Sequence, residues 1–177
     1  MFRMRSAVTA LEQARGLFGR QTGPRIGHLH GIAHQVDHHI ASRGVLHGIA
    51  DEVAQRDGHR GFGRIVNISS VNGQTGQFGQ TNYSASKAGM HGFTMALARE
   101  VARKGVTVNS VSPGYCETPL VLAMPEEIRA GIIRGVPVGR LGRPDEIARV
   151  VEFLSADASG FITGANIPVN GGLFMSF

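Results

Sequence analysis

Two short runs of β-branched residues, separated by one amphipathic helix, constrain the fold of this 177-residue chain most strongly. The runs at residues 64–68 and 106–111 have the composition of buried parallel strands. Between them, residues 81–103 carry apolar side chains at helical spacing. The positions expected to be buried are Met90, Phe93, Leu97 and Val101, with Arg99, Glu100 and Arg103 facing outward. A strand, a helix and a second strand in this order predict an α/β fold with a parallel sheet.

The remaining elements follow after residue 118. Helices are predicted at 125–134, which has Pro and acidic residues in its first turn, and at 145–154, which is amphipathic. A last strand is expected at 166–169, and Gly105 is a candidate C-cap for the long helix. At this length we expect a single domain with a sizeable core.

Composition argues against several classes of function. The net charge is +5, but there is no dense basic run, zinc spacing or aromatic-interleaved patch, so we expect no nucleic-acid binding. No stretch of about eighteen consecutive apolar residues occurs, so we expect no membrane span. Cys116 is the single cysteine, which rules out an internal disulfide and is consistent with the cytoplasm. Nothing near it in sequence would lower its pKa, so we expect an inert thiol.

Ser70, Tyr83 and Lys87 have the chemistry needed for hydride transfer to a carbonyl. Tyr83 and Lys87 lie four residues apart, so the phenol and the ammonium share one helix face. The glycine-rich segment between Ser70 and Tyr83 is predicted to be a loop that folds the serine back toward the tyrosine. When hydride reaches a carbonyl carbon, the oxygen needs a proton. Tyr83 would donate it, the Lys87 cation would favour its release, and Ser70 would hold the oxygen.

These residues and their surroundings resemble the short-chain dehydrogenase/reductase family. The matching pieces are Asn67-Ile-Ser-Ser70, Tyr83-x-x-x-Lys87, Val108-Asn-Ser-Val-Ser-Pro-Gly114 with Thr118, and Asn170-Gly-Gly172. Within the family, residues 61–83 are most similar to the NADPH-dependent acetoacetyl-CoA reductases of polyhydroxybutyrate synthesis. The resemblance covers about residues 60–175. It implies that 61–177 form the catalytic C-terminal part of a doubly wound Rossmann-type parallel sheet.

The resemblance also implies a cofactor, a substrate and an assembly. The cofactor is NADPH, the substrate is an acyl-CoA or acyl-ACP thioester, and the expected assembly is a homo-oligomer, a tetramer in the family. The implied catalytic residues are Ser70, Tyr83 and Lys87. The implied cofactor-binding residues are Tyr83, Lys87, Pro113, Gly114 and Thr118, and the implied substrate-binding residues are Gln77, Phe78, Gln80 and Tyr115. Residues 119–143 would form a lid over the substrate. An alternative activity within the family is that of a 3-oxoacyl-ACP reductase of fatty acid synthesis.

Residues 1–60 do not fit this pattern. They contain no glycine-rich strand-to-helix turn, so N-terminal cofactor-binding strands are not recognisable. Seven of the eight histidines lie here without metal-ligand spacing, so no metal site is expected, and the eighth, His91, is expected to be an exposed helix residue. One hypothesis is that this segment is a frameshifted or disordered stretch. The missing glycine-rich turn supports a second interpretation of the whole chain. In this interpretation the chain is a catalytically inactive remnant whose sheet leaves apolar side chains uncovered, at Ile65, Val66, Val106 and Val108.

Overall fold

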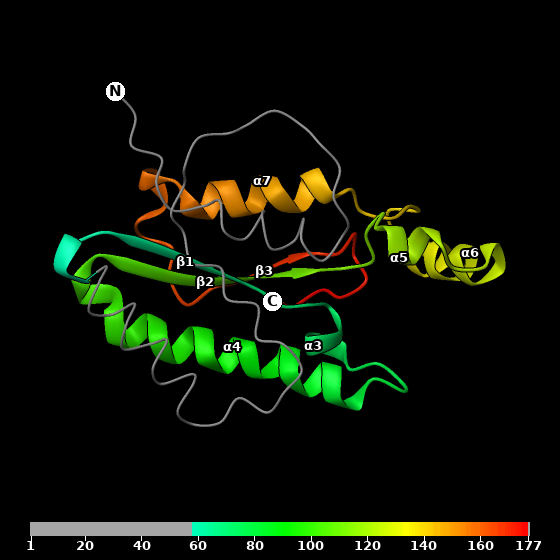
Figure 1. The fold of residues 1–177 in the computed structure, drawn as a ribbon, viewed down its shortest axis with the longest axis horizontal. Helices are drawn as coiled ribbons and strands as arrows, with labels where there is room; N and C mark the ends of the chain where they lie inside the picture. The colour runs from blue at the N-terminus through cyan, green and yellow to red at the C-terminus, as the bar shows by residue number, and fades with distance from the viewer. Residues whose placement is uncertain (1–57, 177) are drawn as a thin grey trace.

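The computed structural model describes residues 58–176, which are built around a three-stranded parallel sheet (Figure 1). Strands β1 (Gly63–Ile68), β2 (Val106–Pro113) and β3 (Asn166–Val169) lie side by side in that order. In the register, Gly63 pairs with Val106 and Ser110 pairs with Asn166. The predicted strands and the α/β class are therefore confirmed. Because the strands are parallel, their carboxyl ends meet at one edge, where α/β sheets place their ligands.

Helix α4 (Thr81–Val101) covers one face of the sheet, and the predicted helix at 81–103 is confirmed (Figure 1). Its last two turns pack against β1 and β2 in an apolar cluster. The cluster contains Ile65, Leu97, Ala98, Val101, Val106 and Val108, with Phe93 partly buried against it. The 3-10 helix η2 (Ala102–Lys104) follows, and Gly105 ends it in the left-handed conformation with φ +74°. Gly105 thus caps this 3-10 extension, whereas the C-cap of α4 itself is Ala102, and the chain turns directly into β2.

Helix α7 (Pro144–Ser155) covers the opposite face (Figure 1). A second apolar cluster forms there from Val66, Val111, Val151 and Leu154. The expectation that apolar faces of the sheet would be uncovered is wrong for the four residues concerned. Their side chains are 9% exposed or less, because α4 buries Ile65, Val106 and Val108 and α7 buries Val66. The described residues therefore form three layers, helix on sheet on helix.

The shorter elements lie mostly at the carboxyl edge. They are η1 (Gly58–Arg60), α3 (Asn72–Thr75), α5 (Pro119–Leu122), α6 (Glu126–Gly135) and η3 (Asp157–Ser159). Helices α5 and α6 extend beyond the sheet (Figure 1), and α6 confirms the helix predicted at 125–134. The predicted loop between Ser70 and Tyr83 is wrong in one part, because it contains the single helical turn α3. No helix in residues 58–176 is long and apolar enough to cross a membrane.

The interpretations of residues 1–57 lie outside the described residues. They include the shifted-frame hypothesis, the missing cofactor-binding strands and all but two of the histidines.

Candidate active site

The chain remains bonded to β2 after β1 ends. The Ser69 N–H donates to the Val111 carbonyl at 2.7 Å, and the Val71 N–H donates to the Pro113 carbonyl at 2.8 Å. These two backbone bonds fix Ser70 between them, at the carboxyl edge of the sheet. The parallel pairing pattern thus places Ser70 more rigidly than a loop residue would be placed.

Hydrogen bonds connect Ser70 to the start of α4. The Ser70 side chain is buried, and its Oγ accepts from the Asn72 N–H at 3.2 Å. Since this bond uses an oxygen lone pair, the hydroxyl hydrogen can donate to a ligand. The Asn72 Nδ2 group donates in turn to Gln80 Oε1 at 3.0 Å, and Gln80 immediately precedes α4.

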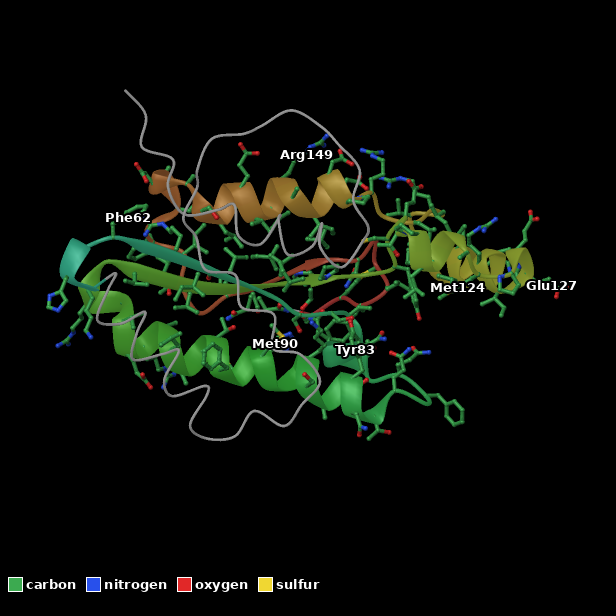
Figure 2. All side chains as sticks on the ribbon, in the orientation of Figure 1. Phe62, Tyr83, Met90, Met124, Glu127 and Arg149 are labelled. Atoms are coloured by element: carbon green, nitrogen blue, oxygen red, sulfur yellow. The ribbon has the colours of Figure 1, made fainter. Side chains whose placement is uncertain are left out.

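Lys87 is anchored at the end of β1. Its Nζ donates to the Ile68 carbonyl at 3.0 Å, and its own carbonyl accepts from the Ser69 hydroxyl at 2.8 Å. The side chain is only 9% exposed, and Nζ lies 5.6 Å from the centroid of the Tyr83 ring. Tyr83 projects from the first part of α4 beside α3 (Figure 2). The cation and the phenol thus occupy one space, as their four-residue spacing predicts.

A glycine allows α3 to approach α4 closely. A Cβ on Gly73 would lie 2.7 Å from the Lys87 carbonyl carbon and 2.9 Å from the Ala88 nitrogen. Any side chain at Gly73 would push α3 away from α4. This close approach keeps Ser70, just before α3, near the helix that carries Lys87.

The chain just after β2 lies close to the end of β3. The Gly114 N–H donates to the Val169 carbonyl at 3.0 Å. A Cβ on Gly114 would lie 2.8 Å from the Asn170 Cα, so this position has no room for a side chain. The Asn170 side chain holds the next turn by accepting from the Gly172 N–H at 3.0 Å and donating to the Phe174 carbonyl at 2.9 Å. The Asn-Gly-Gly motif therefore supports the segment that follows Pro113.

Thr118 and Cys116 lie on the loop that follows. The Thr118 hydroxyl oxygen accepts from the Val121 N–H at 3.3 Å and caps α5. Cys116 is a free, half-buried thiol whose pKa is raised, first by burial and then by the Glu146 and Glu117 carboxylates. A raised pKa disfavours the nucleophilic thiolate, which supports the expectation of an inert thiol.

The predicted substrate-binding residues come from two separate segments. Gln77, Phe78 and Gln80 lie between α3 and α4 and are exposed, with Phe78 fully so, and Tyr115 is half-buried after β2. Gln80 is linked to Ser70 through Asn72, whose side-chain amide donates to Gln80 and whose backbone N–H donates to Ser70. The structure does not pack Phe78 against the other three residues.

His91 is a residue that the sequence reasoning misjudged. It is half-buried, and its Nε2 lies 3.2 Å from the Ser112 hydroxyl oxygen at the end of β2. Burial lowers its pKa below 6.5. The expectation of an exposed helix residue is therefore wrong, because its side chain turns toward the sheet. The signal was present in the sequence: Tyr83, Lys87 and His91 follow one another at four-residue steps along one helix face.

The chain is similar to a known protein family and to individual curated proteins. Residues 27–174 match the family model described as enoyl-(acyl carrier protein) reductase. This match begins upstream of Asn67, where the first motif shared with the short-chain dehydrogenase/reductase family begins. Among curated proteins, an acetoacetyl-CoA reductase from Allochromatium vinosum is 69% identical over 116 residues, covering 66% of this chain and 47% of that protein.

Two further relatives differ in the thioester that appears in their names. An acetoacetyl-CoA reductase from Cupriavidus necator is 60% identical over 131 residues, covering 74% of this chain and 50% of that protein. A 3-oxoacyl-(acyl-carrier-protein) reductase from Pseudomonas aeruginosa is 52% identical over 115 residues, covering 65% of this chain and 48% of that protein. The chain spans about half the length of the curated relatives it matches.

Proposed function

This chain belongs to the short-chain dehydrogenase/reductase family, and on that premise we propose that it reduces the 3-keto group of an acyl thioester with NADPH. Acetoacetyl-CoA is the proposed preferred substrate and 3-hydroxybutyryl-CoA the product, as in polyhydroxybutyrate synthesis. The observation that carries the proposal is the grouping of Ser70, Tyr83 and Lys87 at the carboxyl edge of the sheet.

Each of the three side chains has a distinct role in this proposal. The Ser70 hydroxyl donates a hydrogen bond to the substrate carbonyl and orients it. As negative charge develops on that oxygen, the Tyr83 phenol transfers its proton to it. The Lys87 ammonium, fixed by the Ile68 carbonyl, stabilises the phenolate that remains. When bound, NADPH supplies the hydride that reduces the carbonyl carbon.

The groups at this edge fit the nicotinamide end of the cofactor. Lys87 carries a donor with three hydrogens, which suits the ribose hydroxyls. The Thr118 oxygen already accepts from a backbone N–H, so its hydrogen can donate to the carboxamide. Pro113 and Gly114 would present backbone atoms beside the ring, since Gly114 has no side chain in the way. Tyr83 would bind the cofactor together with Lys87.

The preference for a coenzyme A thioester rests on the exposed loop before α4. Gln77, Phe78 and Gln80 are accessible there, and Tyr115 lies on the loop after β2. We propose that these four side chains contact the acyl thioester. The two acetoacetyl-CoA reductases named above are more similar to this chain than the Pseudomonas aeruginosa protein is, which favours CoA over ACP. We further propose that the protein is a cytoplasmic homo-oligomer, a tetramer as is usual in the family.

The decisive experiment measures NADPH oxidation by the purified chain with acetoacetyl-CoA. Tyr83→Phe removes the proton donor, and we expect it to lower kcat by about 100- to 10,000-fold. Tyr115→Phe is the matched variant at the other tyrosine, and we expect it to raise KM for the thioester while kcat changes little. Running acetoacetyl-ACP in parallel distinguishes the two thioesters by kcat/KM.

Three results would count against the proposal. Equal activity of Tyr83→Phe and the unmodified chain would remove Tyr83 from the chemistry. A higher kcat/KM for the ACP thioester would favour the 3-oxoacyl-ACP reductase. A folded, soluble chain without turnover on either thioester would identify a catalytically inactive remnant.

A further inference from the structure

The layer between α4 and the sheet changes character along the helix. At its C-terminal end, Leu97 and Val101 pack among the apolar side chains of β1 and β2. Toward the catalytic end, polar groups make the contacts: Thr94 Oγ1 accepts from Asn67 Nδ2 at 2.9 Å, and His91 bonds to Ser112. Of these two bonds, the His91 bond lies nearer to Tyr83 and Lys87 along α4, and it ends on Ser112, next to Pro113.

The pair formed by His91 and Ser112 belongs to a larger network. The Ser110 and Ser112 hydroxyls both donate to Asn166 Oδ1, at 2.9 and 2.7 Å. Neither serine has any exposed surface. Because the Ser112 hydrogen is committed to Asn166, its oxygen can only accept from His91. This requires a hydrogen on His91 Nε2, so the network selects one tautomer of the neutral ring.

This network joins the two halves of the candidate site. His91 lies one helical turn after Lys87 and two turns after Tyr83 on the same face of α4. Ser112 immediately precedes Pro113, where the proposed nicotinamide-binding segment begins. Asn166 extends the link into β3, whose Val169 accepts from Gly114. One hydrogen bond thus connects the helix that carries the proton donor to the strand end that would carry the cofactor.

We propose that His91 is a positioning residue of this site. Its bond to Ser112 sets how far the Tyr83 and Lys87 side chains stand from the segment that begins at Pro113. The proposal rests on the proposed function, because that distance matters only when a proton donor and a cofactor act on one carbonyl. A displacement of about 1 Å between reacting groups costs on the order of 100-fold in rate. His91 itself does not contact the reacting atoms.

The test compares variants by kcat in the NADPH-dependent reduction of acetoacetyl-CoA. His91→Ala and Ser112→Ala each remove the bond, and we expect kcat to fall by about 10- to 100-fold, with KM for the thioester little changed. The double variant is expected to lose no more than either single variant, because both remove the same interaction. His91→Gln keeps an N–H donor of similar reach, and we expect it to restore most of the activity.

Thr94→Val provides the matched control. It removes the neighbouring bond between α4 and the sheet, which joins the buried side chains of Thr94 and Asn67. We expect its melting temperature to fall about as much as that of His91→Ala, whereas its kcat stays close to that of the unmodified chain. Equal loss of kcat in Thr94→Val and His91→Ala would mean that His91 has a merely structural role. Failure of His91→Gln to recover activity would also overturn the proposal.

A second measurement decides the matter if the unmodified chain shows no turnover, in which case the proposed function has failed on its own. Nitrogen chemical shifts of the imidazole, assigned by their loss in His91→Ala, should report a hydrogen on Nε2. The amide signals of Gly114 and Tyr115 should move in His91→Ala but not in Thr94→Val or His91→Gln. Unmoved amide signals, or a hydrogen on Nδ1 alone, would show that His91 does not position this segment.

Discussion

Ser69 and Ser70 are adjacent and both buried, but their hydroxyl groups have different partners. Successive side chains of an extended chain point to opposite sides, so two neighbouring serines cannot face the same partner. The Ser69 hydroxyl donates to the Lys87 carbonyl and ties α4 to β1. The Ser70 oxygen accepts from the Asn72 N–H and presents its hydroxyl at the strand end. At the scale of single residues, the first serine supports the helix and the second is the one available to a substrate.

Replacing each serine by alanine should separate these tasks. Ser70→Ala removes a donor to the substrate oxygen, so we expect kcat to fall by about 100-fold with little change in melting temperature. Ser69→Ala removes a bond within the core, so we expect a loss of about 1 kcal/mol in the free energy of unfolding. Thermal melting and steady-state kinetics on the same preparations provide both numbers. A larger loss of kcat in Ser69→Ala than in Ser70→Ala would contradict this assignment.

His91 gives the stability of the protein a defined pH dependence. Burial lowers its pKa below the ordinary 6.5 of the unfolded chain, so near pH 6 the unfolded state binds more protons. The folded state is therefore expected to lose stability as pH falls through 6.5 toward the lower, folded pKa, and to be unaffected well above 6.5. Urea unfolding of the unmodified chain and of His91→Gln, at a series of pH values from below 6.5 to well above it, measures the effect. The other histidines are common to both proteins and cancel in the comparison, so parallel pH profiles would disprove the expectation.

At the scale of elements, Gly73 sets the distance between α3 and α4. An alanine there would place its Cβ 2.7 Å from the Lys87 carbonyl carbon, which is backbone and cannot rotate away. We expect Gly73→Ala to displace α3, to cost about 1–3 kcal/mol of stability and to lower kcat, because Ser70 moves with α3. Gly92→Ala is the matched control within α4, since no described atom lies within 4 Å of the added Cβ.

The control should move in the opposite direction. Replacing a glycine by alanine in an unobstructed helix stabilises it by about 0.5–1 kcal/mol. Chemical unfolding of both variants measures the difference, and kinetics show whether only Gly73→Ala affects turnover. If Gly73→Ala were as stable and active as Gly92→Ala, the close approach of α3 and α4 would have no role in the site.

The start of α7 depends on the ionised form of Glu146. Its carboxylate accepts from both Arg140 guanidinium N–H groups, at 2.7 and 2.8 Å, and from the Arg143 N–H at 2.8 Å. The Arg140 bonds first, and then the Arg143 bond, lower the pKa of Glu146 from 4.5 to about 2. Since the folded pKa is the lower one, this contribution is complete above pH 4.5 and is lost as pH falls toward 2. Glu146→Gln should flatten the stability profile in this window, as urea unfolding at a series of pH values would show.

The elements were more predictable than the contacts between them. Periodicity alone located the strands and the long helix, because burial of one face imposes a repeat on the sequence. The turn α3 was missed, since a single turn shows no periodicity, and its closeness to α4 depends on the absence of a side chain at Gly73. His91 was misjudged because polarity suggested solvent, whereas its partners Ser112 and Asn166 are distant in sequence. Spacing identified Tyr83 and Lys87, but not the Ile68 carbonyl that fixes the ammonium.

At the scale of the described molecule, the two faces of the sheet have different roles. The α4 face carries Tyr83, Lys87 and the polar network, and the α7 face carries an apolar cluster. Arg64 links the layers at the opposite end of the strands. Its guanidinium donates to the Gly63, Gly105, Ala156 and Asp157 carbonyls. The sheet is thus held on both sides, whereas the proposed chemistry lies on the α4 side.

Truncation of the core on each face would test this division. Leu154 on the α7 face is fully buried among Val66, Val111 and Val151, and Leu97 holds the corresponding place on the α4 face. Leu154→Ala and Leu97→Ala should each lower the free energy of unfolding by about 2–5 kcal/mol, because each leaves a cavity in a packed cluster. Since both clusters rest on the same strands, each variant should shift a single transition seen alike by far-ultraviolet dichroism and by amide exchange. At temperatures where the Leu154→Ala protein remains folded, its kcat should stay close to that of the unmodified chain, because α7 packs on the face opposite to the helix that carries Tyr83 and Lys87. Separate melting of α7, or a loss of kcat as large as that of Ser70→Ala, would mean that the two faces are not divided in this way.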